Sequence, residues 1–226
     1  MYLSELTAMP WLSDSDVGAA RRFVRAFAEL SVVSDLCHRA PAGLAELVPA
    51  DVLTWDRVEL ATGAVRHEAI PAEVEPPGAF AAIADDAAGH PLLSPHAAGR
   101  RAAVRLSETV EPRRLSRSEV YGDLLRPSGF VYGIAIGIST GRGEVIVAGL
   151  GRREQQFSER DRDVLDLVRP GLENALQAAE TREHLARALA PNPPLDTAVV
   201  LLNGCGEIER SSLDAERWLA EHFGAA

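Results

Sequence analysis

One amphipathic pattern, from residue 157 to residue 189, constrains the fold of this chain more than any other feature. Ser158 and Asp161 form a capping-box pattern at its start, in which two side chains bond the free backbone amides of a helix end. After them, apolar residues recur at steps of three and four, which is the period of one helix face. The members of this stripe are Val164, Leu167, Val168, Leu172, Ala175, Leu176, Ala179, Leu185 and Leu189. The pattern predicts a helix of about thirty residues, or roughly 45 Å.

A helix of that length extends beyond a small domain, so its far end needs a second domain or a second copy of the chain. Pro170 complicates it, because a proline inside a helix cannot bond the carbonyl of Asp166 and bends the helix. We therefore predict a kink there, with residues 161–169 on the sheet and residues 171–189 leaning toward a partner. The residues expected to form this dimer or output surface are Val164, Val168, Leu172, Leu176 and Ala179.

Composition narrows the class of protein. The chain has 226 residues, of which 46% are apolar, enough for one large domain with an extension or for two small domains. Its net charge of −10 argues against binding of bare nucleic acid, which requires neutralisation of phosphates. We find neither a signal-peptide pattern nor an apolar run of about 20 residues. Cys37 and Cys205 lie far apart and suggest no disulfide framework. We expect a cytoplasmic protein without membrane contact.

Residues 51–70 predict a first β-hairpin. Residues 51–60 are rich in β-forming side chains and are followed by a turn at Gly63. The charged residues of this strand, Asp56, Arg57 and Glu59, gather toward its end. We expect the strand to leave the core at that point.

A second hairpin is predicted from residues 130–139 and 144–151. The first of its strands alternates bulky and small side chains, so that one face is bulky and the other almost bare. The bulky face consists of Phe130, Tyr132, Ile134, Ile136 and Ile138. A bare face lets another backbone approach closely, and we expect the alanine-rich helix after Ser158 to make that contact. The bulky face would then line the core or a pocket on the opposite side.

The end of the chain has a different composition. Residues 190–196 contain three prolines and predict a stiff, extended linker. Residues 197–226 predict strand, turn, strand and helix, which is too little to fold alone without a disulfide or a metal. This extension either docks back on the main domain, residues 1–189, or belongs to a longer natural chain. We favour the longer chain.

The sequence contains letters that match catalytic motifs, but it lacks the structural surroundings that those motifs require. Gly137, Ser139 and Gly141 match the spacing of a nucleophile elbow, but the elbow needs a strand followed by a helix, and here a second strand follows. The six histidines do not pair with one another or with the cysteines at metal-ligand spacing. We therefore expect no catalytic residue, no metal site and no cofactor.

A few side chains are candidates for contact with a ligand. Those that we expect near a cavity are Trp55, His90, His96, Tyr121 and Tyr132. Their alternative roles are core packing for the aromatic residues, and helix capping or surface exposure for the histidines. Residues 100–126 also carry an excess of arginine in an acidic chain. That excess indicates either a solvated helical surface or a contact to an anionic ligand or acidic partner.

Residues 157–161 (Phe-Ser-Glu-Arg-Asp), with Arg169 and Pro170, resemble the closing helix of the GAF-like sensory regions of LuxR-type transcriptional regulators. Further pieces match in the same order. They are residues 47–52 with Trp55, residues 90–93, residues 119–121 and residues 126–129. The resemblance implies an α+β fold of the PAS/GAF type. Its antiparallel sheet would have long N- and C-terminal helices on one face and residues 71–125 on the other.

The resemblance has limits that shape the expected function. Nothing here resembles the helix-turn-helix module of such regulators, so contact with DNA would require a module that this chain lacks. The signature of cyclic-nucleotide GAF domains is also missing, and residues 199–223 are instead similar to a segment that begins like a PAS motif. We expect a non-catalytic domain that senses an unidentified ligand or signal and forms a homodimer through its terminal helices. The alternative is a dimerisation and protein-interaction scaffold without a small-molecule pocket.

Overall fold

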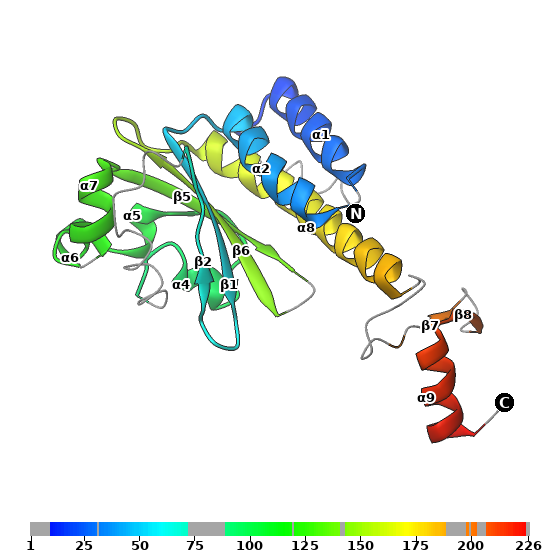
Figure 1. Ribbon diagram of the computed structural model, residues 1–226. Helices are drawn as coiled ribbons and strands as arrows, with labels where there is room; N and C mark the ends of the chain where they lie inside the picture. The colour runs from blue at the N-terminus through cyan, green and yellow to red at the C-terminus, as the bar shows by residue number, and fades with distance from the viewer. Residues whose placement is uncertain are drawn as a thin grey trace.

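An antiparallel β-sheet forms the centre of the computed structural model, which describes residues 10–30, 32–71, 89–118, 120–140, 143–188, 198, 200–202 and 207–224 (Figure 1). Its strands are β1 (Val52–Glu59), β2 (Val65–Arg66), β3 (Ala69–Ile70), β4 (Val104–Arg105), β5 (Tyr132–Ser139) and β6 (Glu144–Arg152). The order across the sheet is β2-β1-β6-β5-β4, and β3 also pairs with β1. Both predicted hairpins are confirmed, since β1 pairs with β2 and β5 with β6 in antiparallel register.

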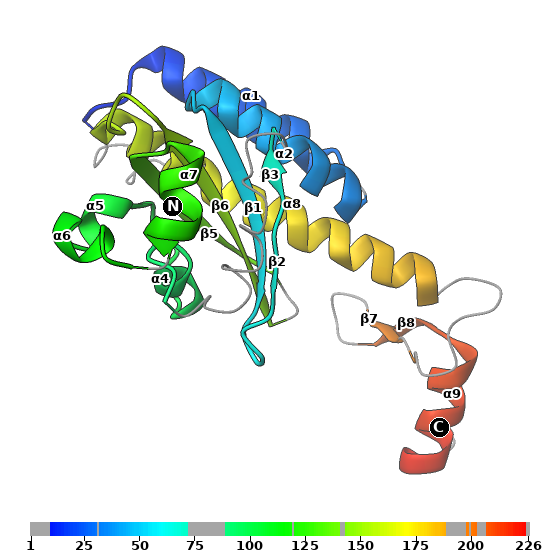
Figure 2. The same ribbon diagram turned by 60° about the vertical axis from the view of Figure 1, so that its left-hand side comes forward.

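The two faces of the sheet are covered by different kinds of structure, as Figures 1 and 2 show. A helical layer of α1 (Asp14–Ala28), α2 (Val33–Leu47) and α8 (Glu159–Ala188) packs on one face. Short elements form a cover over the other: α4 (Ser94–Ala97), α5 (Leu106–Thr109), α6 (Pro112–Leu115), the π-helix η3 (Val120–Leu125) and α7 (Arg126–Ser128). The predicted α+β class is confirmed, with an antiparallel sheet and the long helices of both ends of the domain on one face.

The bulky face of β5 packs on the helical layer, and the bare face meets the cover. Ile134, Ile136 and Ile138 lie in one buried cluster with residues of α8 such as Leu165 and Leu172. The prediction that the bare face contacts the long helix is therefore wrong. The physical reason is burial: the helical layer offers a broad apolar surface, and large side chains gain most from packing against it. Close approach does occur on the bare face, but the approaching segment is α4.

The predicted helix after Ser158 is confirmed. Ser158 Oγ accepts a hydrogen bond from the Asp161 backbone N–H at 3.2 Å, and Asp161 Oδ2 accepts one from the Ser158 N–H at 3.0 Å. The stripe that was expected to face a partner is instead buried within one protomer and is at most 1% exposed. Its residues are Val164, Val168, Leu172, Leu176 and Ala179. They therefore hold α8 on the sheet and on α1 and α2.

α8 continues through Pro170 and does not lean away from the domain after it. Gly171 explains the close packing, because a Cβ atom there would lie 2.4 Å from Cγ1 of Val24 in α1. Near its C-terminal end the helix is tied to the turn between α1 and α2. Arg182 Nη1 donates to the backbone oxygen of Leu30 at 3.0 Å, and Glu183 Oε1 accepts from the N–H of Val33 at 2.8 Å. The predicted departure of residues 171–189 is thus wrong for residues up to Glu183.

A network of ion pairs joins the helices to the sheet at the opposite end of α8. Arg160 Nε donates to Asp16 Oδ1 at 3.0 Å, and Arg160 Nη1 donates to the backbone oxygen of Leu47 at 3.1 Å. Arg152 Nη1 donates to Asp161 Oδ2 at 3.0 Å. The hydrogen bond from the Arg160 side chain lowers the pKa of Asp16 from 3.8 to about 2. The network connects α1, α2, β6 and α8, so it fixes the register of the helical layer.

The extension forms a small unit of its own. β7 (Val200–Leu202) pairs with β8 (Ile208–Ser211) in antiparallel register, and α9 (Leu213–Phe223) follows. Ser212 Oγ accepts from the N–H of Ala215 at 3.3 Å and caps α9. The predicted linker, residues 190–196, and the turn around Cys205 lie outside the described residues. Within the described part of the chain, none of the helices has both the length and the apolar character that crossing a membrane requires.

We expect Gly171→Ala to destabilise the protein by about 1–3 kcal/mol, because the added methyl group would overlap the stiff side chain of Val24. Gly18→Ala in α1 is the matched control. Its nearest neighbour would be the flexible end of Arg22 at 3.5 Å, so better helix propensity should stabilise it by roughly 0.5–1 kcal/mol. Urea unfolding of both variants measures the difference, and equal stabilisation by the two substitutions would contradict the close packing.

The ion pair of Asp16 predicts a loss of stability in acid. Since the folded state lowers the pKa of this carboxyl from 3.8 to about 2, its contribution is complete above pH 4 or so and disappears as the pH falls through about 2. Asp16→Asn should therefore be less stable than the wild type near pH 7, and the difference should shrink toward about pH 2. Asp14→Asn, an exposed change in the same helical turn, serves as the control in thermal unfolding across this range.

Candidate functional site

Three polar side chains, two of them buried and one half-buried, lie together on the cover side of β1. Thr54 and Asp56 are two residues apart on the strand and so point to the same face. Thr54 Oγ1 donates a hydrogen bond to Asp56 Oδ2 at 2.9 Å, and Asp56 Oδ1 bonds the Nδ1 atom of His67. The side chains of His67 and Asp56 are only 3% and 5% exposed. Buried polar groups are costly unless paired, and this trio pairs its members with one another.

His67 reaches Asp56 because of an irregularity in the hairpin. It lies between β2 and β3, both of which pair with β1. The backbone of this segment stays attached there, since the N–H of Trp55 donates to the oxygen of Glu68 at 2.8 Å. The ring of His67 therefore comes to the same face as the carboxylate of Asp56.

Asp56 and His67 are not among the site residues predicted from the sequence. The strand was expected to leave the core at its charged residues, yet Asp56 is 4% exposed, whereas Glu59 is exposed. A signal was present in the alternation of the strand, which puts Thr54, Asp56 and Val58 on one face. That signal becomes informative only with the hairpin register, which places His67 beside them.

Apolar side chains continue this face of the sheet. Val58 lies in a second buried cluster with residues from both the sheet and the cover. Its other members are Val65, Leu93, Ala135, Val145 and Val147. The cover side of the sheet therefore combines a polar trio at β1 with an apolar surface on β5 and β6.

α4 lies directly on the bare face of β5. A Cβ atom on Gly137 would be 2.9 Å from Nδ1 of His96, so the ring of this histidine occupies the space that a side chain would fill. His96 is fully buried, and its Nδ1 lies 2.6 Å from the backbone oxygen of Arg100. A carbonyl oxygen only accepts, so Nδ1 carries the proton. Burial lowers the pKa of His96 below 6.5, which keeps the ring neutral near pH 7.

The five residues expected at a ligand cavity are divided between the two faces. Trp55 and Tyr132 belong to the core beneath the helical layer. His96 packs on the cover side, and His90, which is 8% exposed, accepts at Nδ1 from the N–H groups of two following residues in a local turn. Tyr121 lies half-buried in η3 of the cover. These five residues thus do not meet around one cavity, because neighbouring positions of a strand point to opposite sides.

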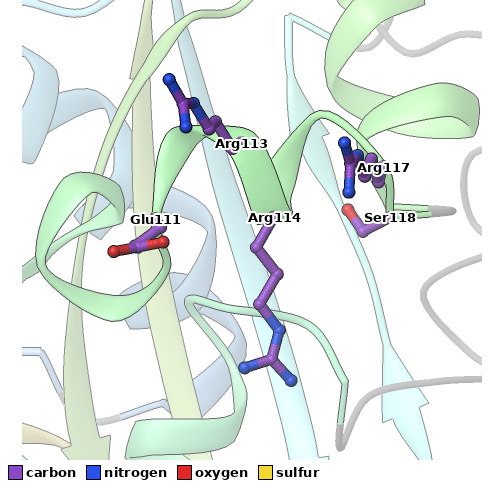
Figure 3. Close-up of a pocket in the computed structure, with 5 residues that line it drawn as sticks. All are labelled: Glu111, Arg113, Arg114, Arg117 and Ser118. Carbon is purple, nitrogen blue, oxygen red and sulfur yellow. The ribbon is translucent and has the colours of Figure 1, made fainter.

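The arginine excess gathers around α6. Figure 3 shows the residues that line a hollow of about 430 Å³ there: Glu111, Arg113, Arg114, Arg117 and Ser118. The three arginines are exposed, and Arg113 and Arg114 point to opposite sides of the short helix. Their exposure fits a solvated helical surface, one of the two predicted roles of this excess. Among the described residues, no group of three or more His, Cys, Asp or Glu side chains could hold a metal ion.

Comparison with known proteins gives similarity in fold only. No family model matches the chain, and no curated protein matches it. Solved structures do match. The LBD domain of VqsR from Pseudomonas aeruginosa is 10% identical, with a TM-score of 0.55 over 75% of this chain and 99% of that one. CepR2 from Burkholderia cenocepacia, an N-acylhomoserine lactone dependent LuxR family transcription factor, is 15% identical, with a TM-score of 0.53 over 74% and 96%.

A structure of SdiA in complex with octanoyl-rac-glycerol is 11% identical to this chain. It has a TM-score of 0.55 and covers 93% of this chain and 78% of SdiA. At such low identity these matches establish a shared fold and nothing about ligands. The fold is the one that the resemblance to LuxR-type regulators implies.

His96 predicts a second dependence of stability on pH. The folded state lowers its pKa below 6.5, so the unfolded chain binds a proton more readily and stability falls as the pH drops below about 6.5. His96→Gln cannot take up this proton and should flatten the slope of unfolding free energy between about pH 7 and 5. His184→Gln, at an exposed position of α8, should keep the wild-type slope. An unchanged slope in His96→Gln would contradict the assignment.

Proposed function

We propose that this chain is the signal-sensing domain of a transcriptional regulator and binds a small molecule between the sheet and its cover. The observation that carries the proposal is the polar trio of Thr54, Asp56 and His67, which lies on the cover side of the sheet. The shared fold with CepR2 and SdiA supports it, because their descriptions connect that fold with N-acylhomoserine lactone and octanoyl-rac-glycerol.

The chemistry of this face favours an amphiphilic ligand. The carboxylate of Asp56 can accept hydrogen bonds from an N–H or O–H group of a polar head. Val58, Val147 and Leu93 offer an apolar surface beside it for an acyl or alkyl chain. Small-molecule sites commonly combine a few oriented polar groups with apolar walls in this way.

The output of such a domain would pass through the helical layer on the opposite side of the sheet. In this proposal two copies form a homodimer through the helices of that layer and the segment that follows α8. Contact with DNA would come from a separate helix-turn-helix module. No catalytic step is proposed.

A second candidate function has a specific observation in its favour. His96 lies against Gly137, and Leu92 comes within 3.0 Å of the position of a Cβ on Gly133, so side chains fill the space between α4 and β5. A scaffold that only dimerises and binds proteins would have a filled interior of this kind. Because the space between α4 and β5 is filled, a ligand of the proposed kind would have to bind near β1, beside the polar trio.

Binding of octanoyl-rac-glycerol and N-octanoyl homoserine lactone tests the proposal. A ligand at about 100 times its Kd should stabilise the domain by roughly 2.7 kcal/mol, which raises its Tm. Thr54→Val and Asp56→Asn should lose most of this shift, each compared with its own ligand-free Tm. Tyr132→Phe, on the opposite face of the same sheet, should keep it.

Calorimetric titration of the same probes measures affinity directly. Binding that is equally tight in Asp56→Asn and in the wild type would overturn the assignment of the trio. If neither probe nor related acyl compounds bind the wild type, the scaffold becomes the better explanation.

A further inference from the structure

A groove runs along the outer surface of the helical layer, between α1 and α2. Its volume is about 600 Å³, and its floor is formed by Phe23 and Phe27. The two rings lie 4.6 Å apart and are only 8% and 5% exposed. The small side chains of Ala26 and Ala42 form the walls and leave the groove open. This groove belongs to the face of the molecule opposite the polar trio.

Basic side chains flank the apolar floor. Arg22 and Arg39 both line the groove and are exposed. Among the described residues neither guanidinium group has a carboxylate partner, whereas many other arginines of the chain do, such as Arg160. Glu46 is the one acidic side chain of the lining. An apolar floor between two free cations fits an amphipathic segment with acidic residues beside its apolar face.

α9 has this chemistry. Its three large apolar side chains are exposed, Leu213 at 78%, Trp218 at 49% and Phe223 at 75%. The ring centroids of Trp218 and Phe223 lie 5.6 Å apart in an edge-to-face arrangement, so the two side chains form one exposed aromatic pair. Three acidic residues and one arginine accompany them. They are Asp214, Glu216, Glu221 and Arg217. Asp214 pairs with Arg217 at 3.3 Å on the surface, and Glu216 accepts a hydrogen bond from Ser211 Oγ at 2.7 Å.

We infer that α9 of one copy of this chain docks in the α1–α2 groove of a second copy, and that the second copy returns the contact. Trp218 and Phe223 would lie on the floor, and Asp214 and Glu221, one helical turn before and after Trp218, would face Arg22 and Arg39. A closed dimer with twofold symmetry contains this contact twice.

The inference rests on the dimer of the proposed function and adds the surfaces that form it. It is independent of the ligand.

Light scattering of the full chain at about ten micromolar should give the mass of a dimer, in the range where a specific interface of micromolar Kd is populated. Trp218→Ala and Ala42→Glu should each weaken the dimer by about tenfold or more, since one removes the anchor and the other blocks its groove. Trp11→Ala removes an exposed aromatic outside the groove and should leave the mass unchanged.

Charge reversal distinguishes exchange between copies from docking within one chain. The groove variant carries Arg22→Glu and Arg39→Glu, and the tail variant carries Asp214→Arg and Glu221→Arg. Each should be a monomer alone, because like charges then meet. Mixed together they should form a heterodimer in native mass spectrometry, since both contacts become complementary. Docking within one chain would leave the mixture monomeric.

The experiments distinguish a failure of this inference from a failure of the proposed function. A strictly monomeric wild type would overturn this inference together with the proposed dimer. A wild-type dimer whose Kd is unchanged in the groove and tail variants would overturn this inference alone. Binding of acyl probes decides the ligand part of the proposed function in either case.

Discussion

α1 and α8 meet at Gly171, and the arrangement of the helical layer depends on that contact. No side chain separates the two helices there, so Val24 lies against the backbone of α8. The ion pair of Asp16 and Arg160 fixes the same two helices at one end, and the bond from Arg182 to Leu30 fixes them at the other. With α1 held in this way, α2 covers the remaining apolar surface of α8 and β1. The stripe of α8 is therefore buried without a second chain.

The sheet separates stability from recognition. Its helical face carries the large aliphatic side chains and Trp55, which supply most of the buried apolar surface. Its cover face carries glycines, small residues and a polar trio, which contribute less to the core. Since packing on the helical face stabilises the sheet, polar groups and irregular structure on the cover face cost little stability. Rigid sheets with irregular segments over one face commonly place recognition on that side.

Local patterns in the sequence predicted the secondary structure well and the placement of side chains less well. The three-and-four spacing after Ser158 sufficed for α8, and alternation sufficed for β5. The predicted departure of α8 from the domain after Pro170 failed because packing at Gly171 keeps the helix on the domain. The polar trio was missed because the pairing of Asp56 with His67 depends on strand register, which a single sequence does not reveal. Trp55, by contrast, was assigned to a cavity when its strand position turns it toward α2.

The adjacency of Trp55 and Asp56 has a mechanical consequence. One peptide unit separates a side chain buried on the helical face of the sheet from a side chain buried on its opposite face. The first turn of α2 is joined in turn to the end of α8, where Glu183 accepts a hydrogen bond from the N–H of Val33. A shift of β1 would therefore act on α2 through Trp55 and, through this hydrogen bond, on the end of α8. The two faces of the sheet are thus connected directly by consecutive residues of β1.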